Sequence, residues 1–192
     1  MLRRLAPALL AGLLVTAAAC DGTTPAVRVD GSSVSEADLL DQVEQWAGNE
    51  AGLSQLLQVS PTGRTPGGYS TDLVTATASL NVLSLLMDDE LERQGIELTQ
   101  EDVAGAREAL APSAEVADQL LEGFSAEQRE WVLRFVAAQV TLLDELGEQG
   151  FGDWAATAYG EADIEVSSRF GSWSAADRRV VAPVGPTRVP RG

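Results

Sequence analysis

The sequence contains no histidine and no lysine, and its one cysteine is Cys20. Without an imidazole or an amine side chain, the chain cannot form a Ser-His-Asp triad, a Cys-His pair or a Schiff-base lysine. The same absence excludes the zinc sites that proteins usually build from histidine and cysteine, and a single cysteine excludes an intrachain disulfide. Only carboxylates, hydroxyls, arginines and the backbone remain for chemistry. We therefore expect no catalytic residue, no metal site, no cofactor and no small-molecule substrate.

Positive charge is scarce as well. The chain has 13 basic residues, all of them arginine, against 29 acidic residues, and its formal net charge is −16. A surface with this excess of negative charge repels phosphate backbones and anionic lipid headgroups. The composition therefore excludes nucleic acid as an expected partner and favours basic or apolar partners.

The first twenty residues, MLRRLAPALLAGLLVTAAAC, follow the plan of a bacterial secretory signal. Arg3 and Arg4 precede an apolar run, and three alanines lead into Cys20. A cysteine directly after small residues resembles a lipobox, in which the cysteine receives acyl chains such as palmitate and anchors the protein. The apolar run is shorter than the roughly 20 residues of a membrane span, and the remaining alternative is an ordinary signal peptide followed by a stray cysteine. We expect a signal peptide at residues 1–19, a tether at 20–25 and a lipid anchor at the extracytoplasmic face of the cell membrane.

Capping residues and apolar stripes at helical spacing predict a mainly α fold. Ser35, Ser70 and Thr99 each stand before such a stripe, with an acidic residue two or three positions later. A glycine after the stripe, as at Gly95, indicates the end of a helix. The helices expected on this basis cover about residues 35–47, 70–94, 99–111, 114–122 and 126–149, and the last is expected to end at Gly150 and Gly152.

Short stretches of alternating apolar and polar residues near both ends predict a few strands. The candidates to pair with residues 26–29 are residues 164–166, 170–173 and 180–181. We expect one irregular multi-helix domain over residues 26–182, in which these strands join the N-terminal and C-terminal segments. Residues 183–192 contain three prolines and two glycines, and we expect them to be a disordered tail.

The segments that stand out chemically have plain structural interpretations. The acidic residues 88–90 are consecutive on an expected helix, so their carboxylates fan out around it and do not converge on a cation. Residues 59–70 are rich in proline and glycine and predict a loop, either a flap or a connector. Trp154 and Trp173 stand beside glycines in segments expected to be irregular, which makes them candidates for an exposed apolar surface.

Three blocks of sequence resemble the SurA and PrsA group of extracytoplasmic chaperones. AVRVDGSSVSEADLL at residues 26–40 is similar to the strand, turn and capped helix that open that module. LMDDELERQGIELTQEDVAGAREAL at residues 86–110 resembles its next helix, link and capping turn, and ADIEVSSRFGSW at residues 162–173 resembles its closing segment. The closing segment departs from the pattern at Ser168, where proline is usual. The family often carries a parvulin prolyl isomerase domain, but this chain has no room for one and lacks its histidines, so no catalytic residue transfers.

The resemblance implies a SurA N-terminal-like lipoprotein that binds unfolded or newly exported polypeptides without catalysis. Residual prolyl isomerase activity is not expected. The alternative is a non-catalytic envelope scaffold that binds one specific folded partner. Apolar residues beside loops, off the strongest helical stripes, are the candidates to contact clients. The predicted client-binding residues are Leu53, Leu56, Leu57, Tyr69, Phe124, Phe151 and Trp154.

Overall fold

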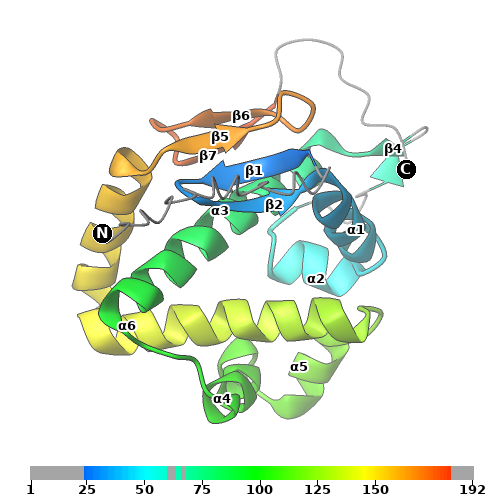
Figure 1. Ribbon diagram of the computed structural model, residues 1–192. Helices are drawn as coiled ribbons and strands as arrows, with labels where there is room; N and C mark the ends of the chain where they lie inside the picture. The colour runs from blue at the N-terminus through cyan, green and yellow to red at the C-terminus, as the bar shows by residue number, and fades with distance from the viewer. Residues whose placement is uncertain (1–23, 60–63, 66–67, 183–192) are drawn as a thin grey trace, which may run out of the picture.

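The computed structural model describes residues 24–59, 64–65 and 68–182, and in this part the chain is mainly helical, as the sequence predicts (Figure 1). Short strands gather at one end, beside helices α1 (Glu36–Ala47) and α2 (Glu50–Gln55). Helix α3 (Thr71–Gln94) runs from this end to the opposite one, which holds α4 (Gln100–Leu110) and α5 (Ala114–Leu121). Helix α6 (Ala126–Glu161) first passes between the two ends and then returns to the strands.

The strand β1 (Pro25–Val29) is the centre of an antiparallel three-stranded sheet. It pairs with β2 (Ser32–Ser35) on one side and with β5 (Ile164–Val166) on the other. The predicted pairing of residues 26–29 with residues 164–166 is therefore confirmed. The sequence does not predict strand β2, because SSVS carries a single apolar side chain. Residues 32–35 are extended because they pair with β1.

The other two segments expected to pair with residues 26–29 do not do so. Strands β6 (Ser172–Ser174) and β7 (Arg179–Val181) pair with each other, and β7 packs against α3, where the Val180 amide donates a 2.9 Å hydrogen bond to Ser79 Oγ. Gly171, directly before β6, permits the close approach of this segment to β7, because a Cβ at this position would lie 2.5 Å from the Val181 carbonyl oxygen. Within residues 59–70, the short strands β3 (Arg64–Thr65) and β4 (Gly68–Tyr69) pair with each other.

The predicted helix starts are confirmed by the caps. The side chains of Ser35, Ser70, Thr99 and Ser125 each accept a hydrogen bond from a backbone amide in the first turn of their helix. Thr99 and Asp102 complete a reciprocal capping box. At the other end of α3, Gly95 takes the left-handed conformation, as predicted for a helix stop.

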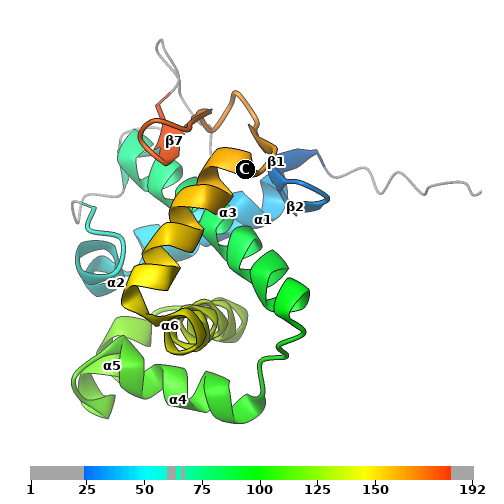
Figure 2. The same cartoon turned by 90° about the vertical axis from the view of Figure 1, so that its left-hand side faces the viewer.

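The predicted end of the last helix is wrong. Gly150 and Gly152 lie inside α6, which continues to Glu161, and the break falls earlier, at Gly147. With φ 71° and ψ 165°, Gly147 occupies a region that is essentially open to glycine alone. Figure 2 shows the bend that follows: residues 148–161 point away from the first half of α6 and run beside α3 toward the strands.

Apolar side chains are buried in three clusters of unequal size. The largest lies between the strands, α1 and the first half of α3, and it includes the fully buried Trp46 and Phe170. A second cluster forms where α3 meets α6, around Met87 and Leu142. The third is small and consists of Ala111, Ala117 and Leu120 beside α2.

Candidate functional site

The predicted client-binding residues do not form one surface. Leu56 and Leu57 line a pocket of about 470 Å³ beside α3. Tyr69 is half-buried beside the first cluster, and its hydroxyl donates a hydrogen bond to Glu44 of α1. The side chain of Leu53 and the predicted lipidation residue Cys20 lie outside the part of the chain that is described, as does the predicted tail at 183–192.

Phe124 is a correction to the predicted set. It is 3 % exposed, and its ring packs edge to face on Trp46, with the two ring centroids 4.8 Å apart and an interplanar angle of 83°. A position beside a loop suggested exposure, but the loop after α5 folds this side chain back into the largest cluster. Phe124 is therefore a core residue.

Trp154 and Phe151 are also placed differently from the prediction. Both lie on the second half of α6 and not in an irregular segment, and their rings lie 5.2 Å apart against the second cluster. The indole Nε1 of Trp154 donates a 2.9 Å hydrogen bond to Glu90, which is only 4 % exposed. Both aromatic side chains are half-buried, and their contacts join α6 to α3.

The Glu90 carboxylate is the centre of a buried polar network. Burial alone would raise the pKa of Glu90, but hydrogen bonds from Arg93, Gln94 and Trp154, together with the charge of Arg93, outweigh it and lower the pKa. Glu90 is therefore ionised at neutral pH. A carboxylate held in this form is suited to joining helices and unsuited to donating a proton.

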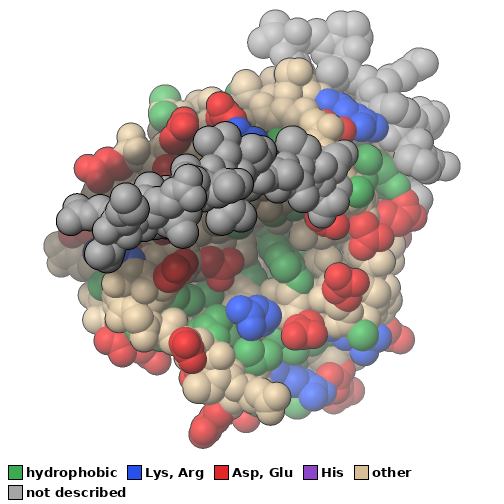
Figure 3. All heavy atoms as spheres, in the orientation of Figure 1, with side chains coloured by type: hydrophobic (Ala, Val, Ile, Leu, Met, Phe, Trp, Pro, Cys, Tyr) green, Lys and Arg blue, Asp and Glu red, His purple; other side chains and the backbone are tan. Residues whose placement is uncertain are grey.

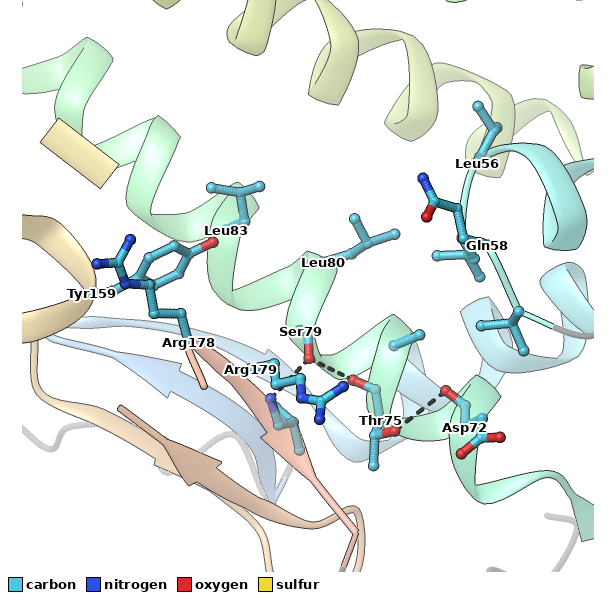
Figure 4. Close-up of a pocket in the computed structure, with 14 residues that line it drawn as sticks. Leu56, Gln58, Asp72, Thr75, Ser79, Leu80, Leu83, Tyr159, Arg178 and Arg179 are labelled. Carbon is cyan, nitrogen blue, oxygen red and sulfur yellow. Dashed lines mark hydrogen bonds between the residues drawn. The ribbon is translucent and has the colours of Figure 1, made fainter. Parts of the chain in front are cut away.

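The pocket lined by Leu56 and Leu57 is built from four separate parts of the chain. Helix α3 supplies one wall with Leu80 and Leu83, and the segment after α2 supplies the two predicted leucines. Tyr159 of α6 and the start of β7 close the remaining sides. All four leucines line the pocket and are half-buried, and Figure 4 labels Leu56, Leu80 and Leu83 around the open space.

The Thr75 and Ser79 hydroxyl groups in this pocket already have partners. Thr75 donates to the Thr71 carbonyl, and Ser79 donates to the Thr75 carbonyl while it accepts from the Val180 amide. The bond from Val180 joins β7 to α3, and the bonds within α3 give neither hydroxyl a base that would activate it as a nucleophile. The pocket thus combines leucine side chains with a polar lining of at least equal extent, and it is suited to binding.

Arg178 and Arg179 form the charged edge of the pocket and were not among the predicted residues. Arg178 lies beside Tyr159 (Figure 4), and burial raises the pKa of the Tyr159 phenol while the charge of Arg178 opposes part of that rise. After residue 4, this is the one place in the sequence where two arginines are adjacent. That pair in so acidic a chain is the signal that could have pointed to the site.

Within the described residues, no group of three or more acidic, histidine or cysteine side chains could hold a metal ion. No helix among the same residues is long and apolar enough to cross a membrane. On the face shown in Figure 3, acidic side chains are spread widely and hydrophobic side chains gather near the middle.

Comparison of the chain with protein-family models, with curated proteins and with solved structures finds no match. The resemblance of three sequence blocks to the SurA and PrsA chaperones therefore stays a prediction.

Proposed function

We propose that this protein is a lipid-anchored, extracytoplasmic, chaperone-like protein that binds unfolded or newly exported polypeptides without catalysis. The observation that carries the proposal is the pocket beside α3, where Leu56, Leu57, Leu80 and Leu83 present half-buried side chains to one open space. Its volume of about 470 Å³ falls in the size range of ligand-binding clefts. Apolar contact without a reacting group is what a binder of unfolded segments needs.

The location and the class of partner rest on the sequence. The signal-like segment ending at Cys20 supports export and anchoring, and the acidic surface keeps exposed apolar groups soluble. The resemblance of residues 26–40, 86–110 and 162–173 to the SurA and PrsA group supports a role with unfolded chains.

Aggregation of a chemically unfolded model protein, followed by light scattering, tests the proposal. The full chain, reconstituted in lipid nanodiscs, should suppress aggregation at several-fold molar excess, and empty nanodiscs should not. Leu83→Gln should weaken suppression because it places an amide in the pocket, whereas Leu146→Gln, a matched half-buried leucine of α6 outside the pocket, should not. Thermal melting establishes that both variants are folded.

Two results would count against the proposal. Absence of suppression by the folded chain would remove the chaperone function, and capture of one stoichiometric folded partner from envelope extracts would favour the scaffold alternative.

A further inference from the structure

The charge of the pocket is opposite in sign to the charge of the chain. The formal net charge is −16, yet the charged residues that line the pocket are one acid, Asp72, and two bases, Arg178 and Arg179. Both arginines belong to the β6–β7 hairpin and come together at the start of β7. The pocket edge is therefore a small positive region on an acidic protein.

Among the described residues, neither of these arginines forms an ion pair. The recorded ion pairs within the described residues use Arg28, Arg93, Arg107 and Arg169, and none uses Arg178 or Arg179. Both side chains are exposed, so their guanidinium groups are open to a ligand. An arginine presents a planar fork of donors that matches the two oxygens of a carboxylate.

The apolar and charged parts of the pocket are arranged side by side. Figure 4 shows Leu80 and Leu83 on α3 facing the open space, with Arg178 beside Tyr159 and Arg179 on the strand side of the same pocket. The backbone donor of Val180 is already bonded to Ser79, so β7 does not offer that amide for pairing with an added strand. Side chains of the ligand must therefore supply most of the recognition.

From this arrangement we infer that the pocket selects peptide segments in which apolar side chains adjoin an acidic side chain. The apolar side chains contact the leucines, and the Asp or Glu carboxylate pairs with Arg178 or with Arg179, whose side chains point to different parts of the pocket (Figure 4). This inference rests on the proposed function and names its substrate class. It reverses the expectation from net charge, under which basic or apolar partners are favoured, because local charge decides what an individual pocket accepts.

The chain's own C-terminal segment follows β7 directly but does not complement the pocket. Residues 183–192 contain Arg188 and Arg191 and no acidic side chain. Charge therefore favours a separate acidic peptide as the occupant.

The test compares three labelled peptides by fluorescence anisotropy with the full chain in zwitterionic nanodiscs, with empty nanodiscs as the blank. The first alternates leucine with glutamate and ends in an amide, the second replaces each glutamate with glutamine, and the third is the glutamine peptide with a free terminal carboxylate. The first should bind about three- to fivefold more tightly than the second, the scale of a partly exposed ion pair. Raising the salt to about 1 M should remove this difference, because exposed charges are then screened.

Two double variants separate local charge from net charge. In R178Q/R179Q the preference for the glutamate peptide should disappear, whereas R28Q/R134Q, which removes the same charge outside the pocket, should retain it. Equal binding of the first two peptides by the unaltered chain overturns the inference and leaves the proposed function intact if aggregation is still suppressed. Tighter binding of the third peptide than of the first would mean that the arginines recognise the terminal carboxylate of a chain and not an acidic side chain. That result also overturns the inference. An increase in affinity after deletion of residues 183–192 would make that segment the occupant and likewise overturn it.

Discussion

The strand end and the α4–α5 end of the molecule differ in what they bury. The strand end buries Trp46, Phe124 and Phe170 in one continuous cluster. The opposite end buries mainly small residues, and α4 has Ala106 as its one buried residue. Because the hydrophobic stabilisation scales with buried apolar area, the two ends contribute unequally to the free energy of unfolding.

This difference in buried side chains indicates which end of the molecule opens more readily. The pocket beside α3 is walled by elements of the well-packed end, so its shape is fixed by the largest cluster. The α4–α5 end has few large buried side chains, which is the physical signature of a region that opens at low free energy. We expect amides of α4 to exchange with solvent faster than those of α3.

Among the substitutions that test the unequal contribution of the two ends, Trp46→Ala should change the free energy of unfolding most. It removes a side chain that is 1 % exposed, and we expect a loss of about 3–5 kcal/mol in the free energy of unfolding. At the other end, where the buried residue of α4 is an alanine, Ala106→Gly should cost only about 1 kcal/mol, the helix-propensity difference. Urea denaturation measures both values. Similar losses for the two variants would contradict the unequal division of the core.

The next largest change in the free energy of unfolding should come from Glu90→Gln, at the contact between α3 and α6 that joins the two ends. Loss of the charged acceptor for Arg93, Gln94 and Trp154 should cost about 1.5–3 kcal/mol at neutral pH. Since the pKa of Glu90 is lowered in the folded chain, its stabilisation is fully present above the ordinary pKa of about 4.5. It is lost as the pH falls through the folded pKa.

Denaturation of the two proteins at a series of pH values measures this pattern. The difference between wild type and Glu90→Gln should be constant near neutral pH and shrink in acid. A difference that stays the same down to the acid limit would show that the carboxylate charge contributes nothing.

A smaller effect should come from Gly147→Ala, which tests the bend between the two halves of α6. An alanine at φ 71° and ψ 165° should cost about 1–3 kcal/mol through backbone strain. Gly152→Ala is the matched control, because Gly152 is helical, has nothing within 4 Å of a built Cβ, and should gain about 0.5–1 kcal/mol. Thermal melting distinguishes the two. Stabilisation by both substitutions would mean that the break at Gly147 does not require glycine.

The predictable part of the fold is the part that local chemistry specifies. The starts of α1, α3 and α4 follow from Ser35, Ser70 and Thr99, because each side chain satisfies amides of its own first turn. Errors arose where distant packing overrides a local signal. Gly150 and Gly152 read as a helix end, but a helical glycine costs only about 1 kcal/mol, and contacts made by the second half of α6 outweigh that cost.

The candidate site was predictable only in part for the same reason. Leu56 and Leu57 were identified because they lie off the main stripes, whereas Leu80 and Leu83 belong to an apolar face of α3 that sequence alone assigns to the core. Whether a residue on such a face meets a neighbour or open space depends on how α6 bends. Phe124 shows the reverse error, since nothing local indicates that its loop returns to Trp46.

The central position of β1 has a consequence for how the chain is made. One of its neighbours, β2, follows it directly, but the other, β5, is recruited from far along the sequence, with Arg28 and Glu165 separated by 137 positions. During synthesis from the N-terminus, β1 must wait with one edge unpaired until nearly the whole chain has emerged. A strand pair this distant in sequence closes late in folding, because a long loop must first be ordered. Until β5 arrives, one edge of β1 offers unpaired backbone groups to any other strand it meets.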